Sequence, residues 1–400
     1  MDTDAPKPEY LLKCLMDHVP DMIYFKDRHS RFIMVNRAAA AWQEQPSPEA
    51  MIGLSDADVY SDDDAQRMRK DELQVMACGE PLYGIEESET WKDGSKAWVS
   101  TTKVPLRNEA GDVIGVFGIS RDITVHKEAE LRAARLAEEN KRFRDEIEHD
   151  LLMASQLQKT FFPTFYPEFD RGAGSLPVQF CHLHEAGGVI GGDLCSIRKL
   201  SDTEVGIFLC DVMGHGVRAA LGTSIVRAVV EEISHQIKDP GSFMLHMNRV
   251  LYPLFRQDDL FLFATACYMV LDVESGRLKM ANAGHPMPVY LDARKGTAEL
   301  LQVCGEQGCP ALAVAEEAHY ATTEFQLEPG DGVFMYTDGI TETMDEAGAE
   351  YGEAGLLQAA GGEMNLPLSD LFQRLYTDAC GFSSNGTIDD DVCLVGFRWP

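Results

Sequence analysis

Five short segments in the second half of the chain place acidic residues or histidine on glycine turns, and they hold the residues best suited to chemistry. In chain order they are Gly191-Gly192-Asp193, Asp211-Val212-Met213-Gly214-His215-Gly216, Ala283-Gly284-His285-Pro286, Thr337-Asp338-Gly339 and Asp389-Asp390-Asp391-Val392. Carboxylates gathered from such distant segments repel one another unless cations hold them together. Hard oxygen ligands without a His or Cys partner indicate Mg²⁺ or Mn²⁺.

These residue types predict one kind of reaction. Two divalent ions about 4 Å apart can hold a hydroxide between them at neutral pH and polarise a phosphoryl group at the same time. The chain offers no Ser-His-Asp or Cys-His arrangement that would supply a competing nucleophile. The predicted metal ligands, which are also the predicted catalytic residues, are Asp193, Asp211, Asp338 and Asp390.

Two histidines in the same segments have more than one interpretation. His215 is a candidate general acid, but a turn residue that opens the following helix is an equal reading. His285 stands in a Gly-His-Pro turn, where bracing the loop is favoured over contact with phosphate.

Strands and helices must bring these segments together, and the sequence predicts an α/β arrangement over about 175–400. Apolar runs at 205–210, 278–281 and 333–336 predict buried strands directly before three of the segments. Helices are expected over 216–236 and 241–255, and the remaining strands over 262–271, 279–283, 288–291, 332–336 and 392–398. Their order predicts sheets layered with helices.

Residues 10–125 form a separate expected domain. Its predicted strands are 22–26, 32–35, 84–90, 97–106 and 113–119, and its helices 37–44 and 63–78. This segment resembles a PAS sensory domain through Asp21-Met22-Ile23-Tyr24-Phe25-Lys26-Asp27, Val35-Asn36, Trp91-Lys92-Asp93-Gly94-Ser95 and Arg121-Asp122-Ile123-Thr124. The resemblance implies that it senses a small molecule or dimerises, with an unknown ligand. Cys78 lacks the Asn-Cys-Arg context of flavin photosensors, and His18 and His29 are expected to be surface histidines.

Residues 126–165 are expected to form a helical coiled-coil linker. The run from 124 to 162 has neither glycine nor proline, which predicts one long helix. Asn140 at a core position favours a parallel homodimer in register, and Asp150 interrupts the pattern as a candidate stutter. A solvated charged helix without a partner is the alternative. The proposed apolar seam consists of Ala129, Ala133, Leu136, Asn140, Phe143, Ile147, Ala154, Leu157 and Phe161.

The second half resembles the SpoIIE-like branch of the PPM metal-dependent serine/threonine phosphatases. The resemblance covers about 150–400, with the phosphatase domain at 170–400, and includes the regulatory-helix stretch 151–159. It implies a PPM-type αββα sandwich within an α+β multidomain chain. It also implies two Mn²⁺ or Mg²⁺ ions, with Asp211 bridging them and the Val212 carbonyl as an additional ligand. The implied substrate is phosphoserine or phosphothreonine on a STAS-domain anti-anti-sigma protein.

Three positions depart from that family pattern. Ser196 stands where a further Asp is usual, which removes a charge near Asp193, and Cys393 stands where Thr is typical. Asp389 and Asp391 leave the fourth ligand ambiguous by one residue, although Asp390 is preferred. These departures keep open a degenerate phosphatase domain that only binds a STAS partner. A diguanylate cyclase is excluded because no Glu-Phe follows Gly191-Gly192-Asp193.

Composition limits the other function classes. The 400 residues carry a net charge of −30, which disfavours nucleic acid and anionic membrane surfaces as partners. No apolar stretch approaches the roughly 18 residues of a spanning helix, so a cytoplasmic protein is expected. The ten cysteines show no CxxC spacing and are expected to be reduced thiols.

Overall fold

The computed structural model describes residues 6–170, 176–257, 260–302 and 309–400 of the chain. It divides into two compact units, Met1–Arg144 and Asp145–Pro400, which we describe separately. Among the helices within the described ranges, none is both long and apolar enough to cross a membrane.

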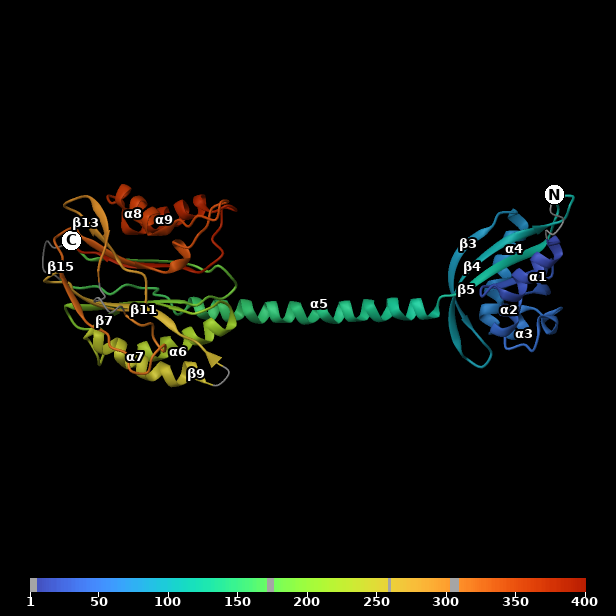
Figure 1. Ribbon diagram of the computed structural model, residues 1–400, viewed down its shortest axis with the longest axis horizontal. Coiled ribbons are helices and arrows are strands. Elements are labelled where there is room, and N and C mark those ends of the chain that lie inside the picture. Colours follow the sequence, from blue (N-terminus) through green and yellow to red (C-terminus); the bar gives the residue numbers. More distant parts are fainter. Residues whose placement is uncertain (1–5, 171–175, 258–259, 303–308) are drawn as a thin grey trace. The chain divides into compact units, whose positions relative to one another are not determined.

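Unit 1 is an antiparallel sheet with short helices, as a PAS fold requires (Figure 1). The strand order is β2-β1-β5-β4-β3, so the first and last strands of the unit meet in the middle of the sheet. The five predicted strands and both predicted helices are confirmed to within a few residues: β1 (Met22–Asp27), β2 (Phe32–Val35), β3 (Leu82–Thr90), β4 (Lys96–Arg107), β5 (Val113–Asp122), α2 (Arg37–Trp42) and α4 (Asp62–Cys78). Two further helices, α1 (Pro8–His18) and α3 (Asp56–Val59), were not predicted.

Side-chain caps explain where two of these helices start and stop. The Asn36 side chain accepts a hydrogen bond from the backbone N–H of Ala39 and so begins α2. Ser61 does the same for α4, and Gly79 ends that helix in the left-handed conformation at φ 70°. These local signals account for the success of the helix predictions in unit 1.

The interior of unit 1 contains a buried carboxylate, Glu89, that has no cationic partner among the described side chains. Glu89 is 4 % exposed, and its Oε2 accepts hydrogen bonds from Trp42 Nε1 at 2.9 Å and the Tyr60 hydroxyl at 3.1 Å. Burial raises the pKa of Glu89 from 4.5 to about 7, and the two hydrogen bonds only partly oppose that rise. The folded unit therefore holds this proton more tightly than the unfolded chain does.

That difference predicts a pH-dependent stability. Glu89 contributes stability in full below pH 4.5, and the contribution is lost as the pH rises through about 7, where the carboxyl ionises. Replacing Glu89→Gln removes the ionisation, so the variant should be the more stable protein at pH 8, by up to about 3 kcal/mol. Urea unfolding followed by tryptophan fluorescence reports on this unit through Trp42, Trp91 and Trp98.

Glu109→Gln is the matched control, because Glu109 is an exposed glutamate of the same unit. The control should keep the wild-type dependence on pH. If Glu89→Gln keeps it as well, the buried carboxyl is not its source.

The predicted long helix is confirmed as α5 (Thr124–Lys159), which runs without a break through Asp150. Most of its side chains are exposed, including the seam residues Leu136 at 59 % and Phe143 at 64 %. Gln158, near its C-terminal end, is the buried residue of the helix. A single chain thus leaves the apolar seam uncovered.

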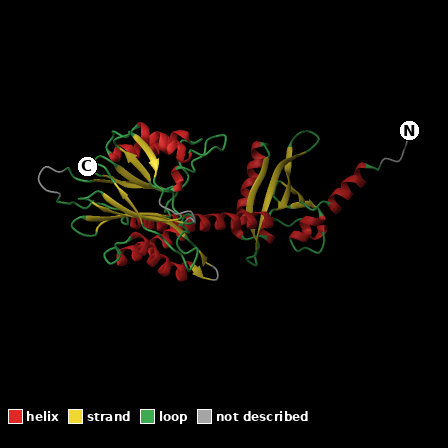
Figure 2. Ribbon diagram, turned by 60° about the vertical axis from the view of Figure 1, so that its left-hand side comes forward, coloured by secondary structure: helices red, strands yellow, loops and turns green. Residues whose placement is uncertain are grey.

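Unit 2 contains two stacked sheets between two pairs of helices, the expected αββα sandwich (Figures 1 and 2). Helices α6 (Val217–Ile233) and α7 (Pro240–Phe255) pack on the first sheet, and α8 (Gly352–Gly362) and α9 (Leu368–Phe382) on the second. The first sheet has the order β15-β12-β11-β8-β7 and the second β14-β13-β16-β17-β6. The strands are β6 (Gln179–Glu185), β7 (Asp193–Lys199), β8 (Glu204–Val212), β11 (Ala264–Asp272), β12 (Arg277–Ala283), β13 (Val289–Asp292), β14 (Thr297–Leu300), β15 (Thr323–Gln326), β16 (Gly332–Tyr336) and β17 (Val392–Arg398), with a small hairpin of β9 (Arg256–Gln257) and β10 (Leu260–Phe261).

A shared apolar layer joins the two sheets. Ile207 and Met269 from the first sheet pack in one cluster with Met335 and Val395 from the second. Alternate residues of the same strands face the helices instead, as Phe208 does toward α7. Strands that are apolar on both faces therefore fix the stacking of the layers.

The structure differs from the expectations in its elements and in one thiol. The strands β6, β7, β14 and β15 and the helices α8 and α9 were not predicted. Cys309 is disulfide-bonded, which contradicts the expectation of reduced thiols throughout. Cys304, the other member of that close cysteine pair in sequence, lies outside the described residues.

Candidate functional site

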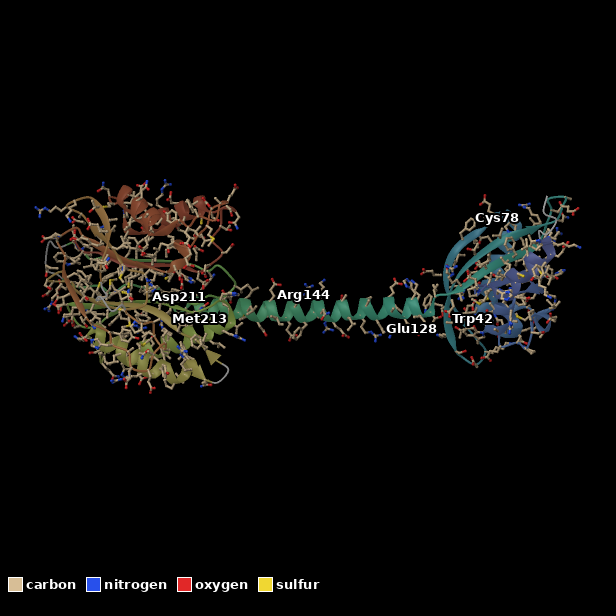
Figure 3. All side chains as sticks on the ribbon, viewed as in Figure 1. Trp42, Cys78, Glu128, Arg144, Asp211 and Met213 are labelled. Atoms are coloured by element: carbon tan, nitrogen blue, oxygen red, sulfur yellow. The ribbon has the colours of Figure 1, made fainter. Side chains whose placement is uncertain are left out.

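Two adjacent strands of the first sheet bring Asp193 and Asp211 together. Asp193 is the first residue of β7, and Asp211 is the last but one of β8. Antiparallel pairing makes the two residues direct partners across the strands, so their side chains are neighbours. Figure 3 labels Asp211 together with Met213, which follows β8.

The second sheet supplies the other two predicted carboxylates. Asp338 lies just after β16, and Asp390 lies just before β17. Because β16 and β17 are antiparallel, the end of one strand adjoins the start of the other. All four predicted ligands therefore come from strand ends, two from each sheet.

Thr337 connects the two sheets at this point. Its hydroxyl donates a hydrogen bond to Asp193 Oδ2 at 2.8 Å and accepts one from the backbone N–H of Cys393 at 2.8 Å. Thr337 is fully buried, and Asp193 is 1 % exposed. The hydroxyl thus orients the most buried carboxylate of the group from the opposite sheet.

The carboxylates disfavour one another's charge. Burial, and then repulsion from Asp211 and Asp391, raises the pKa of Asp193 well above its usual value. Burial raises the pKa of Asp211 to about 7, and Asp338 and Asp390 are the next largest causes. The pKa of Asp338 is raised by burial and then by Asp390. Asp390 contributes to the raised pKa values of both Asp211 and Asp338, so the carboxylates of the two sheets act on one another electrostatically. A bound cation would oppose these shifts.

The backbone at Gly192 passes close to the carboxylates. A Cβ atom at Gly192 would lie 2.6 Å from the Val212 carbonyl oxygen and 3.2 Å from Asp211 Oδ1. Glycine is therefore required where the loop passes the carbonyl predicted to bind metal. Within the described residues, no three His, Cys, Asp or Glu side chains converge closely enough to be a preformed metal site. The all-oxygen donor set nevertheless matches Mg²⁺ or Mn²⁺.

The run Asp389-Asp390-Asp391 separates into different roles. Asp391 is buried and accepts hydrogen bonds from the backbone N–H of Gly187 at 3.0 Å and of Gly192 at 2.6 Å. Asp390 is exposed and accepts one bond, from the Asp391 N–H at 2.8 Å. Asp391 therefore anchors the glycine loop, while the Asp390 carboxylate stays available. This geometry supports the preference for Asp390 as the ligand.

Sequence reasoning missed a residue that joins α5 to the site. Gln158 donates from Nε2 to the Gly191 carbonyl at 2.6 Å and accepts from the Gly191 N–H at 3.1 Å. It is 7 % exposed, although the rest of its helix is mostly open to solvent. One signal for this role was present in the sequence, which is a polar side chain within the apolar-rich stretch 151–159. Its partner Gly191 is 33 residues away and could not be identified from the sequence.

Two further residues support or extend the group. The Thr223 hydroxyl of α6 donates to the Gly192 carbonyl at 2.8 Å. Glu342, which follows Asp338 by one helical turn, has a pKa raised by burial and then by Asp338. The sequence pattern had singled out neither residue.

The two histidines behave differently. His285 is 3 % exposed, and its Nδ1 hydrogen-bonds the Thr265 hydroxyl at 2.9 Å. Burial lowers its pKa to about 3, and its backbone bonds Asn282, so it braces the loop as predicted. His215 lines a pocket beside Asp390 and is placed near the carboxylates.

Ser196 does not occupy a vacant ligand position. It lies three residues from Asp193 on β7, so the two side chains point to opposite faces of the strand. Its hydroxyl accepts a hydrogen bond from Arg198 Nε at 2.8 Å. Strand alternation therefore turns the Ser196 side chain away from Asp193, and its effect on metal affinity stays a prediction.

Two surface pockets adjoin Asp390 on different sides. One is lined by Leu151, residues 187–190 and residues 215–217, and the other by residues 342–344 and 383–385. Both include Asp389 and Asp390. A group bound at Asp390 can thus be reached from the surface.

A carboxylate group at the end of an αββα sandwich defines the class of this unit. The model of the family described as "Stage II sporulation protein E (SpoIIE)" matches residues 201–400, and that described as "PAS fold" matches residues 16–128. The chain belongs to the SpoIIE family.

Curated relatives agree with this membership. "Phosphoserine phosphatase RsbP" of Bacillus subtilis (strain 168) is 26% identical over 219 residues, covering 54% of this chain and 51% of the relative. "Phosphoserine phosphatase RsbU" of the same strain is 25% identical over 206 residues, covering 51% and 56%. The chain thus spans about half the length of these relatives.

A solved structure agrees with the fold. The SiaA-PP2C domain of Pseudomonas aeruginosa superposes with a TM-score of 0.54 at 21% identity, over 64% of this chain and 98% of that domain. Unit 2 therefore has a PP2C-type fold.

The anchoring role of Asp391 predicts a loss of stability on truncation. Asp391→Ala leaves the N–H groups of Gly187 and Gly192 without their acceptor, which should lower the free energy of unfolding by about 2 kcal/mol after relief of carboxylate repulsion. Urea unfolding followed by circular dichroism in EDTA measures the change. Asp389→Ala, at the exposed neighbour, should change it by less than about 0.5 kcal/mol. Equal stabilities of the two variants would contradict the anchor.

Proposed function

We propose that the chain is a metal-dependent protein phosphatase that hydrolyses phosphoserine or phosphothreonine on a protein partner. One observation carries this proposal: Asp193 and Asp211 of the first sheet and Asp338 of the second have pKa values that are raised by burial and then by neighbouring carboxylates. The names of the relatives RsbP and RsbU support the reaction class. The favoured partner is a phosphorylated STAS-domain protein.

The proposed ligands divide the work at the site. Asp193, Asp211 and Asp338 would hold two Mn²⁺ or Mg²⁺ ions together with Asp390 and the Val212 carbonyl, with Asp211 between the ions. Bound ions supply an activated water and polarise the phosphoryl group. The chain's own residues position this centre: Thr337 orients Asp193, and Asp391 holds the glycine loop in place.

The proposed division of labour follows the chain. Residues 10–125 sense a signal, residues 126–165 connect and dimerise, and residues 170–400 carry out hydrolysis. A non-catalytic domain that binds a STAS partner is the competing function. Ser196 is a weak argument for that alternative, because its side chain lies on the opposite face of β7 from Asp193.

Removing a ligand should abolish metal-dependent turnover. Asp211→Asn and Asp338→Asn each keep the side-chain shape but lose a negative charge, and phosphate release from p-nitrophenyl phosphate at saturating Mn²⁺ should fall at least about 100-fold. EDTA should abolish phosphate release by the wild type, and added Mn²⁺ should restore it. Folding without metal should survive, since each change relieves repulsion.

The matched control is Asp202→Asn, because the Asp202 side chain is fully exposed. This variant should keep wild-type turnover. A wild type without Mn²⁺-dependent hydrolysis of either p-nitrophenyl phosphate or a phosphoserine protein would favour the binding-module alternative. Near-normal activity of Asp211→Asn would refute the site.

We further propose that α5 forms a parallel homodimer through its apolar seam. The supporting observation is the exposure of Leu136, Phe143 and Ile147 along one helix, at 59 %, 64 % and 44 %. Isolated charged helices need no such seam, and Asn140 within it would fix the register of two parallel copies.

Charging the seam should dissociate that dimer. Leu136→Asp places a carboxylate at a core position, whereas Ala134→Asp places the same side chain two residues away, off the seam. Sedimentation of the full chain at micromolar concentration should give a dimer for wild type and Ala134→Asp and a monomer for Leu136→Asp. A monomeric wild type would show that the helix is a solvated spacer.

A further inference from the structure

Unit 1 encloses a small cavity whose wall carries an unusual number of charges. Its volume is about 30 Å³, room for one or two water-sized groups. The wall includes four carboxylates and two lysines, each at most 7 % exposed: Asp56, Glu72, Glu87, Glu89, Lys26 and Lys103. Ionised, these groups would leave a net negative interior.

Both lysines form ion pairs with carboxylates other than Glu89. Lys26 Nζ lies 2.6 Å from Asp56 Oδ2 and 2.5 Å from Glu72 Oε1. Lys103 Nζ lies 3.0 Å from Asp71 and 3.8 Å from Glu87. Across the described part of the chain, Glu89 has no ion-pair partner, and its hydrogen bonds come from the neutral donors Trp42 and Tyr60. Trp42 is labelled in Figure 3.

The same cavity wall holds acceptor atoms without donors. Gln43 Oε1 and Glu72 Oε2 are buried and have no hydrogen-bond partner among the described residues. Gln43 is held in place because its Nε2 donates to the Tyr60 hydroxyl, which itself donates to Glu89. Buried acceptors cost free energy when they are unsatisfied, so these two oxygens would gain from an added N–H or O–H donor.

We propose that the cavity binds a small cation that carries N–H donors, either ammonium or the head group of a small primary amine. A primary ammonium group has three donors, which matches the acceptors offered by Glu89, Gln43 and Glu72. Its charge compensates Glu89, which water alone would leave without a counter-ion. An anion is excluded by the surplus of carboxylates, and the volume admits only a compact group.

The position of the acceptors gives the cation a structural effect. Gln43 directly follows α2, Glu72 lies on α4, and Glu89 lies on β3. A ligand bonded to all three would join the sheet to two helices in the interior of the unit. It would also lower the cost of ionising Glu89, so binding should strengthen as the pH rises through neutrality.

Calorimetric titration of the full chain at pH 8 and constant ionic strength tests the proposal. Ammonium chloride and methylammonium chloride are the probes, and sodium and tetramethylammonium chloride are the controls, because neither control has an N–H donor. We expect saturable binding of at least one probe, no binding of the controls, and weaker probe binding at pH 6. Ammonium and methylammonium together distinguish a free ion from an amine head group.

Variants of the wall localise any binding to the cavity. Glu89→Gln should weaken it on the order of tenfold or more, since a charge-assisted acceptor is lost. Glu109→Gln, with the same chemical change on the surface, should bind as wild type does. Gln43→Met removes an acceptor without changing charge and should also weaken binding, which gives a second test that does not alter the carboxylate.

Three results would overturn the proposal. The first is a wild type that binds neither probe, which would leave the cavity to water. The second is an equal response to sodium or tetramethylammonium, which would reflect screening alone. The third is binding that Glu89→Gln and Gln43→Met leave unchanged, which would place the cation elsewhere.

Discussion

Repulsion between buried carboxylates is the constraint on which the arrangement of unit 2 depends. Asp193 and Asp211 are cross-strand partners, and at a separation of about 5 Å and an effective dielectric constant of 20 two such charges repel by about 3 kcal/mol. Asp338 and Asp390 add to this from the second sheet. The apolar layer between the sheets must offset that cost, and it does so with side chains that are almost all inaccessible to solvent. A cation bound at the strand ends would offset this repulsion.

The residues around the carboxylates are the ones that keep this strained group in place. Thr337 donates a hydrogen bond to Asp193 from the opposite sheet. Both carboxylate oxygens of Asp391 accept hydrogen bonds from the glycine loop. Gln158 clamps Gly191 through two hydrogen bonds, one to its carbonyl and one from its N–H. The next residue, Gly192, bonds Asp391. Because Gln158 belongs to α5, any rotation of the C-terminal turn of that helix must break the clamp or move the loop. The contact gives the proposed linker a direct mechanical connection to the proposed metal site.

Much of the fold and the carboxylates of the candidate site could be predicted from the sequence. Apolar runs before Asp211 and Asp338 predicted strands that deliver carboxylates, and two helices of unit 1, α2 and α4, were also predicted. The supporting residues could not be read in this way, because Thr337 and Gln158 acquire their roles only through partners 144 and 33 residues away. The choice between Asp390 and Asp391 was equally hidden, since identical side chains differ only in burial. Motif spacing ignores the alternation of a strand, so it did not show that Ser196 points away from Asp193. The helices α8 and α9 were missed because the sequence analysis centred on the acidic turns, and neither helix contains one.

The two units share one physical solution although their folds differ. Each buries carboxylates beyond what its own lysines and arginines neutralise, at Asp193 and Asp211 in one unit and at Glu89 in the other. The stability of the folded state then depends on a cation that compensates these carboxylates. In the proposed phosphatase site this cation is a divalent metal ion, and in the proposed cavity it is a small cation with N–H donors. Because binding stabilises only the unit that holds the ligand, the two cations should act additively when the units unfold independently. Any departure from additivity would then measure the coupling between sensing and catalysis, since linkage makes the effect of each ligand on the other equal.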